Sequence, residues 1–264
     1  MIVIYQPVIE IATGHVVRAE VLCRFPDGAQ EMQNLGTFIP HAEQMGLIGA
    51  LTQSVMALAL TERAGWNAPL PLSFNISRLD IEDPTFFDRA MALLEKFKIN
   101  PTTITFELND GIQVIENGAG FEMMRRFRAA GMRLCVDGFG PTLSTFSYLE
   151  LERVAVQEVK MDVLGHLSTA KRVTIASVVE LTKPLRIDVV AKGVETAERL
   201  AQVGELGCGF AQGYGIAKPM EQEALLLWLA GREIAGGNAS VAPSPANGAP
   251  AKRSFLGGLF GKRT

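Results

Sequence analysis

Short apolar runs and stretches with helical spacing alternate along the first 233 residues of the chain. Apolar runs rich in β-branched residues are typical of buried strands. They cover residues 2–11, 17–25, 70–77, 103–108, 133–138, 155–161, 187–194 and 209–214. Between them, apolar positions recur at intervals of three and four, which predicts helices at 37–46, 48–65, 84–98, 118–130, 168–182, 196–206 and 221–233.

Breakers separate these elements. Pro84 follows Asp83 where a helix is expected to begin, and Gly131 and Gly207 stand where two helices are expected to end. Regular alternation of strand and helix over this length predicts a parallel sheet with helices outside. The number of strands favours an α/β fold of the closed (β/α)₈ type, a TIM barrel, over an open doubly wound sheet.

A change of composition divides the chain into a folded part, 1–233, and a tail, 234–264. Residues 235–252 consist mainly of Gly, Asn, Ser, Ala and Pro, which cannot repay the entropy of ordering, so the tail is expected to be disordered. The last residues, 252–263, combine Phe255, Leu256, Leu259 and Phe260 with basic flanks. Two interpretations remain open: a frayed end, or a tethered peptide that docks on a protein or touches a membrane.

Composition and charge exclude several classes of protein. The chain has 264 residues, and 48% are hydrophobic, which is enough for a packed core. With 25 basic and 28 acidic residues, the net charge of −3 gives no general attraction to DNA, RNA or anionic lipid. No apolar run reaches the roughly 18 residues that span a bilayer, and no export signal is evident, so a cytoplasmic location is expected. Cys23, Cys135 and Cys208 lack metal-ligand spacing and are expected to be reduced and buried.

Polar residues stand at the predicted carboxyl ends of many strands, where barrel enzymes place their chemistry. They are Glu20, Arg24, Asn75, Glu107, Asp137, Lys160, Asp162, Lys192, Glu195 and Gln212. Three carboxylates and an amide that converge on one mouth suit Mg²⁺, Mn²⁺ or Ca²⁺, and a phosphate ester is the natural substrate of such a cation. On spacing alone, a cation and phosphate site and a set of satisfied structural residues are both open.

Several short sequence motifs, in the same order along the chain, resemble those of a known family. They are Tyr5-Gln6-Pro7-Val8, Ala19-Glu20-Val21-Leu22-Cys23-Arg24, Phe38-Ile39-Pro40, Phe74-Asn75-Ile76-Ser77, Glu107, Val136-Asp137, Val159-Lys160-Met161-Asp162, Val190-Ala191-Lys192-Gly193-Val194-Glu195-Thr196 and Gln212-Gly213-Tyr214. Together they resemble the EAL domain, a family of cyclic di-GMP phosphodiesterases and their degenerate relatives. The resemblance runs from about residue 3 to 232. It implies a modified TIM barrel and a role in bacterial signalling.

The resemblance also implies roles for single residues. In active members, two cations about 3.5–4 Å apart hold the attacking water and the phosphate of cyclic di-GMP. Lys160 matches the lysine that steadies water and phosphate, and Glu195 matches a further family position. The first-metal ligands are matched by Glu20, Asn75, Glu107 and Asp137. The residues expected to bind the nucleotide are Gln6, Glu20, Leu22, Arg24, Asn75, Asp137, Lys160 and Gln212.

The departures from the family pattern fall at the second metal. Gly138 replaces an aspartate that binds this metal, and Lys192 replaces a glutamate assigned as general base or metal contact. Together these changes make the site more positive by three charges, and a second cation near Lys192 would meet roughly 8 kcal/mol of repulsion before screening. Asp110 shortens a helper glutamate, and Pro141 stiffens the loop that follows Asp137.

These departures predict a degenerate EAL domain without phosphodiesterase activity. Its expected use is either as a cyclic di-GMP receptor or as a protein-interaction module that no longer binds nucleotide. Neither use requires a cofactor. The rival hypothesis is a residual metal-dependent phosphodiesterase with Mg²⁺ or Mn²⁺ at a single remaining site. Structural explanations also stand: Arg24 pairing with a carboxylate, Lys192 bridging Glu20 and Glu107, and Gly138 relaxing a turn. A homodimer and an unidentified protein partner are compatible with the sequence.

Overall fold

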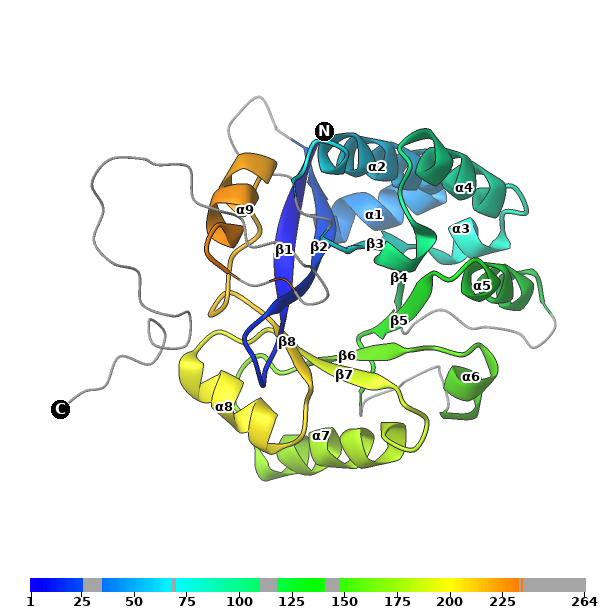
Figure 1. The fold of residues 1–264 in the computed structure, drawn as a ribbon. Helices are drawn as coiled ribbons and strands as arrows, with labels where there is room; N and C mark the ends of the chain where they lie inside the picture. The colour runs from blue at the N-terminus through cyan, green and yellow to red at the C-terminus, as the bar shows by residue number, and fades with distance from the viewer. Residues whose placement is uncertain (26–34, 68–69, 110–117, 141–147, 233, 235–264) are drawn as a thin grey trace, which may run out of the picture.

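Eight strands close into a barrel in chain order, with helices around the outside (Figure 1). The computed structural model describes residues 1–25, 35–67, 70–109, 118–140, 148–232 and 234. The strands are β1 (Ile2–Glu10), β2 (Val16–Arg24), β3 (Leu72–Ile76), β4 (Ile104–Asn109), β5 (Arg133–Asp137), β6 (Glu158–Asp162), β7 (Asp188–Lys192) and β8 (Phe210–Gln212). All eight lie within or next to the predicted ranges, so the barrel is confirmed.

The expected all-parallel sheet is wrong for one strand. β1 runs antiparallel to both neighbours, β2 and β8, whereas every other neighbouring pair is parallel. The reason is the connection between β1 and β2, which consists only of residues 11–15. A parallel pair needs a crossover of about a dozen residues, so this short connection forms a hairpin. The reversed strand places Gln6 opposite Glu20 in register.

The helices follow the strands and cover the barrel (Figure 1). They are α1 (Leu35–Gln44), α2 (Ile48–Arg63), α3 (Arg78–Glu82), α4 (Phe86–Lys96), α5 (Ala119–Ala129), α6 (Tyr148–Arg153), α7 (Thr169–Thr182), α8 (Ala197–Glu205) and α9 (Gln222–Leu229), with a 3₁₀ turn at Pro101–Thr103. The sequence pattern did not predict α3 or α6. Gly131 and Gly207 follow α5 and α8 with φ of +88° and +91°, as expected of glycines that end helices.

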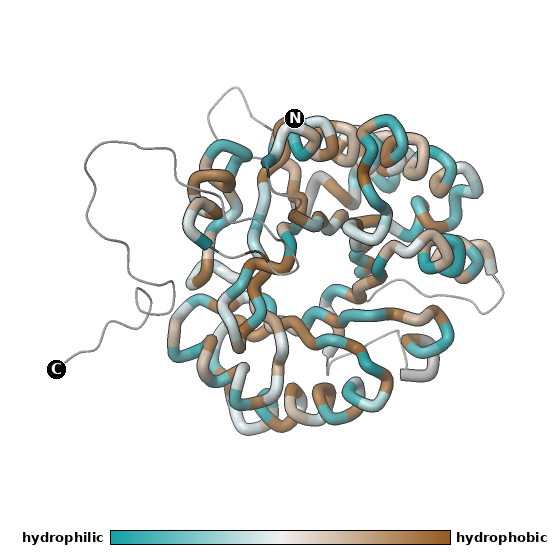
Figure 2. The backbone as a smooth tube through the Cα atoms, viewed as in Figure 1, coloured by the Kyte–Doolittle hydropathy of each residue, from teal (hydrophilic) through white to brown (hydrophobic). Residues whose placement is uncertain are grey.

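The apolar core lies between the barrel wall and the helices. Phe86 of α4, Phe106 of β4 and Phe127 of α5 form one aromatic cluster, with ring centroids 4.6–5.9 Å apart. In Figure 2 the hydrophobic stretches follow the strands and recur along the helices, where they alternate with hydrophilic positions. Cys23, Cys135 and Cys208 are buried free thiols, as predicted. Among the described residues, none of the helices has the length and apolar character needed to cross a membrane.

One residue that the composition placed in the tail belongs to the described part of the fold. Ile234, assigned to the tail, packs against the core and forms a parallel bridge with Val16 at the start of β2. Residues 235–264 lie outside the described residues, and so do Asp110 and Pro141. The predictions that concern these residues remain predictions.

Candidate functional site

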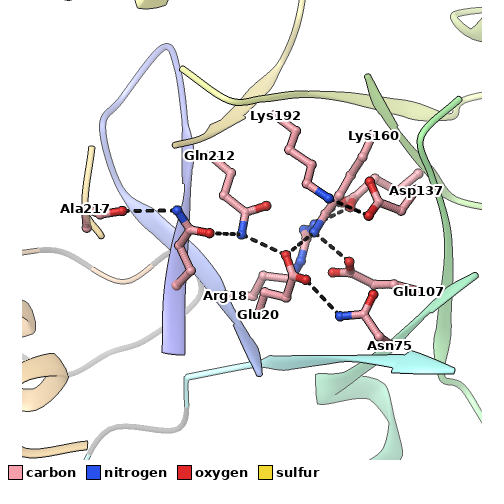
Figure 3. Close-up of polar contacts among 11 residues, drawn as sticks. Arg18, Glu20, Asn75, Glu107, Asp137, Lys160, Lys192, Gln212 and Ala217 are labelled. Carbon is pink, nitrogen blue, oxygen red and sulfur yellow. Dashed lines mark hydrogen bonds and ion pairs between the residues drawn. The ribbon is translucent and has the colours of Figure 1, made fainter. Parts of the chain in front are cut away.

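Lys160 occupies the centre of a polar network inside the barrel (Figure 3). Its Nζ atom lies 2.7 Å from Glu20 Oε2 and 2.6 Å from Glu107 Oε2. All three side chains are buried. They come from β6, β2 and β4, whose alternating side chains point into the barrel at these positions. One ammonium therefore links two carboxylates from different parts of the wall.

Amide side chains extend this network toward β1 and β3. Asn75 Nδ2 donates to Glu20 Oε1 at 2.8 Å, and Gln212 Nε2 donates to Glu20 Oε2 at 2.8 Å. Gln212 also donates to Gln6 Oε1 at 3.3 Å, and Gln6 donates to the Ala217 carbonyl oxygen at 3.2 Å. Glu20 is thus held from three sides, and its charge is shared among one ammonium and two amides.

Lys192 forms a second ion pair at the mouth. Its Nζ atom is 2.6 Å from Asp137 Oδ2, and 41% of its side chain is exposed against 17% for Asp137. The sequence alternative in which Lys192 bridges Glu20 and Glu107 is wrong, because Lys160 fills that place from deeper in the barrel. Gly138, which follows Asp137, adopts φ of +82° in a turn, so the structural explanation for this glycine fits its conformation.

Burial and neighbouring charges shift the pKa values of the two glutamates in this cluster in opposite directions. Burial favours the neutral form of Glu20, but the ammonium groups of Lys160 and Lys192 outweigh it and lower the pKa of Glu20 to about 2. Burial and the neighbouring charge of Glu20 raise the pKa of Glu107 to about 7, although Lys160 opposes this shift. Burial works against the charged forms of both lysines, yet the carboxylates raise the pKa of Lys160 and Lys192 above the ordinary value. Both lysines therefore stay protonated.

A charged pair below this network escaped the sequence analysis. Arg18 Nη1 donates to Glu158 Oε2 at 2.7 Å, its other terminal nitrogen donates to Glu158 Oε1, and both side chains are buried. The signal was available, because Arg18 and Glu158 precede Glu20 and Lys160 by two residues. A spacing of two places them on the same inward face of β2 and β6.

The remaining predicted residues lie around the network. Leu22 and Asn75 line a cavity of about 560 Å³ that reaches α1 and α2. Among the described residues Arg24 pairs with no carboxylate; its Nη1 donates to the Cys23 carbonyl oxygen at 2.8 Å. Glu195 follows β7 with an exposed side chain. The structure thus brings Gln6, Glu20, Asn75, Glu107, Asp137, Lys160, Lys192 and Gln212 together, and it places Leu22 at their edge.

The side chains of the site offer few ligands for a second metal ion. A first metal ion would have to compete with the two lysines for the carboxylates. Glycine at 138 offers no side-chain ligand, and each carboxylate of the predicted first-metal set touches an ammonium. Within the described part of the chain, no group of three His, Cys, Asp or Glu side chains is arranged to hold a metal ion. Three buried acceptors of the network, Glu107 Oε1, Asp137 Oδ1 and Gln212 Oε1, have no hydrogen-bond donor among the described residues.

Comparisons with known proteins agree on one family. The family model described as EAL domain matches residues 1–219. The chain is 33% identical over 233 residues to the cyclic di-GMP phosphodiesterase PA2567 of Pseudomonas aeruginosa, with 86% of this chain and 39% of that protein covered. It is 29% identical to the cyclic di-GMP phosphodiesterase RocR of the same organism, with 86% of this chain and 59% of RocR covered. The chain therefore spans less than two thirds of the length of these relatives.

A solved structure is similar to this chain in both fold and sequence. The protein described as PaMucR phosphodiesterase in complex with c-di-GMP superposes with a TM-score of 0.76 and 26% identity. The match covers 85% of this chain and 98% of that one. This chain therefore shares its overall fold with a solved structure described as a phosphodiesterase.

Proposed function

Because this chain belongs to the EAL domain family, we propose that it is a degenerate member that binds cyclic di-GMP as a receptor and does not hydrolyse it. The observation that carries the proposal is the ion pair between Lys192 and Asp137, with Nζ 2.6 Å from Oδ2. An ammonium occupies the place beside Asp137 where a catalytic cation would be needed. In this chain the positive charge that a metal ion would present to a phosphate is supplied by the Lys192 side chain.

Electrostatics supports binding without hydrolysis. Lys192 stays protonated beside Asp137, and a protonated lysine cannot accept a proton from water, so it cannot act as a general base. Lys160 is committed to two carboxylates in a buried position. With glycine at 138, the site also lacks the side chain that would hold a second cation. A phosphodiester can be bound by such a site, but water is not activated in it.

Calorimetric titration with cyclic di-GMP tests the receptor hypothesis. We expect binding in the presence of EDTA, no gain in affinity when excess Mg²⁺ replaces EDTA, and intact nucleotide when the mixture is analysed afterwards. A strict requirement for Mg²⁺ would contradict the metal-independent receptor. The absence of binding under every condition would favour the interaction module instead.

Lys192→Met provides a sharper test of the charge that replaces the metal. The variant leaves Asp137 without its ammonium, so the mouth gains one uncompensated negative charge near the nucleotide phosphates. We expect affinity for cyclic di-GMP to fall about tenfold, as for loss of a charge-assisted contact. The matched control is Lys183→Met, which removes a lysine whose side chain is 73% exposed and pairs with Glu180. The control should bind as the wild-type protein does.

A residual phosphodiesterase is the second candidate, favoured by the two buried carboxylate oxygens without donors. Glu107 Oε1 and Asp137 Oδ1, with Glu20 and Asn75, would hold a single Mg²⁺ or Mn²⁺ if Lys192 moved aside. A cation there would polarise the phosphate. Electron paramagnetic resonance with Mn²⁺ distinguishes the candidates: the receptor hypothesis expects weak Mn²⁺ binding in the wild-type protein and tighter binding in Lys192→Met. Metal-dependent hydrolysis by the wild-type protein, lost in Glu20→Ala, would establish the phosphodiesterase.

A further inference from the structure

Two ion pairs cross the barrel one above the other. β2 and β6 are four strands apart in both directions around the closed barrel, so they face each other. Arg18 of β2 forms a two-pronged contact with Glu158 of β6. Two residues further along the same strands, Glu20 pairs with Lys160 at 2.7 Å. Figure 3 draws Arg18 together with Glu20 and Lys160.

The two pairs have opposite polarity. On β2 the cation of Arg18 precedes the anion of Glu20, and on β6 the anion of Glu158 precedes the cation of Lys160. Each charge therefore has an opposite charge across the barrel and another opposite charge two residues away on its own strand. This alternation leaves the guanidinium of Arg18 bound to Glu158, so it does not compete with Lys160 for Glu20 and Glu107.

Stability alone does not account for the lower pair. Arg18 is 5% exposed and Glu158 is 1% exposed, so both ions have been taken out of water. Desolvation on this scale offsets most of the attraction, and apolar replacements of similar volume often match or exceed the stability of a buried ion pair. What an apolar pair cannot supply is the alternation of charges that sets each ion of β2 and β6 two residues from an ion of opposite sign.

We infer that Arg18 and Glu158 are positioning residues that hold Lys160 and Glu20 in the geometry required for the nucleotide phosphates. The inference rests on the proposed function, because it names residues that support the same site. Neither residue is expected to touch the nucleotide. Their guanidinium and carboxylate fix β2 against β6 immediately below Glu20 and Lys160, which keeps the polar network of the site preorganised without metal.

The first test replaces the pair by apolar side chains of similar length, Arg18→Met with Glu158→Leu, in the full chain. We expect a thermal midpoint near that of the wild-type protein and a loss of about tenfold in affinity for cyclic di-GMP by calorimetry, as for supporting residues at other sites. The matched control is Arg133→Met with Asp188→Leu, which removes a pair at 2.9 Å whose side chains are 40% and 42% exposed. The control should keep wild-type affinity.

The second test needs no nucleotide. In ¹⁵N-lysine spectra, the buried ammonium of Lys160 should give a slowly exchanging signal, assigned by its loss in Lys160→Arg. We expect this signal to vanish or shift in the apolar double variant and to persist in the Arg133 and Asp188 control. If the double variant fails to fold, Arg18→Lys takes its place, because it keeps the charge but loses the two-pronged contact.

The two tests separate the inference from the function on which it rests. A folded variant with wild-type affinity and an unchanged Lys160 signal would overturn the positioning role. If the wild-type protein binds no cyclic di-GMP, the receptor proposal fails by itself, and the ammonium signal still decides whether Arg18 and Glu158 position Lys160. Loss of the signal without a change in affinity would also overturn the inference, because the geometry would then not matter to the ligand.

Discussion

Glu20 and Glu107 share the ammonium of Lys160, yet they hold protons differently near neutral pH. Lys160 and Lys192 keep Glu20 ionised, with a pKa of about 2 despite its burial. Glu107, buried beside the charge of Glu20, has a pKa of about 7 instead of 4.5. Such a pair titrates as a unit, with one carboxylate well below and one well above the ordinary range. The state of Glu107 therefore changes within the physiological range of pH.

Removing the charge of Glu107 should change how stability depends on pH. A raised folded-state pKa means that the folded protein binds the proton more tightly between pH 4.5 and 7, so stability falls as pH rises through this window. The side chain in Glu107→Gln does not ionise, so this variant does not lose stability in this way as the pH rises. We expect its unfolding free energy, relative to the wild-type protein, to increase from pH 5 to pH 8 by at most roughly 3 kcal/mol. Urea titrations across this range measure it, and a constant difference would contradict the shifted pKa.

Restoring the second-metal residues should be strongly non-additive. Gly138→Asp alone leaves Lys192 to repel the cation, and Lys192→Glu alone leaves the metal without a ligand beside Asp137. The double variant restores three units of negative charge and should bind Mn²⁺ better than either single variant. Because Gly138 has φ of +82°, aspartate there costs about 1 kcal/mol, so any hydrolysis should be weak. Mn²⁺ titration and product analysis check it, and full activity from either single variant would contradict it.

The sequence predicted which residues form the site, but it did not predict which of them contact one another. Strand ends and the family resemblance identified Glu20, Glu107 and Lys160, which the structure brings within hydrogen-bond distance. Which lysine bridges the carboxylates could not be predicted, because this depends on depth in the barrel and not on order in the chain. Arg18 and Glu158 were not predicted because they lie before the strand ends, although inward-facing charges deeper in a strand also need partners.

At the scale of elements, long periodic segments were predicted and short ones were not. The two missed helices, α3 and α6, have five and six residues, which is too short for a periodicity of 3.6 to be recognised. The direction of β1 was also missed, although five connecting residues already exclude a parallel crossover. Local hydrogen bonds explain α3: Ser77 accepts from Asp80 N, and Asp80 accepts from the backbone N–H of Ser77.

This capping box predicts a measurable cost. Ser77→Ala removes the hydroxyl that caps α3, and we expect a loss of roughly 1 kcal/mol in unfolding free energy. Because Ser77 also lines the cavity next to Asn75, affinity for cyclic di-GMP should weaken slightly as well. The control is Ser54→Ala in α2, whose exposed hydroxyl donates to the Ala50 carbonyl oxygen. Equal losses in the two variants, measured by thermal unfolding, would show that the cap contributes nothing specific.

At the scale of the whole molecule, the closed barrel satisfies the backbone hydrogen bonds of its strands within the described residues. β1 pairs with both β2 and β8, so the sheet has no open edge for the tail to cover. The last described residue, Ile234, adds a bridge to Val16 at the base of β2. The sheet thus closes within the described residues, and the composition of residues 235–264 predicts that this segment adds little to the core.

Two truncations that differ by two residues test where the fold needs its last described residue. A protein that ends at Ile234 should unfold within about 2 °C of the full chain, because the removed segment is poor in core-forming residues. A protein that ends at Arg232 also loses the half-buried Ile234 and its bridge to Val16, so its midpoint should fall by about 2–4 °C for a domain of this size. Calorimetry on the three proteins measures both steps. A large drop already at the first truncation would show that the tail packs on the barrel and that its apolar residues dock within the same chain.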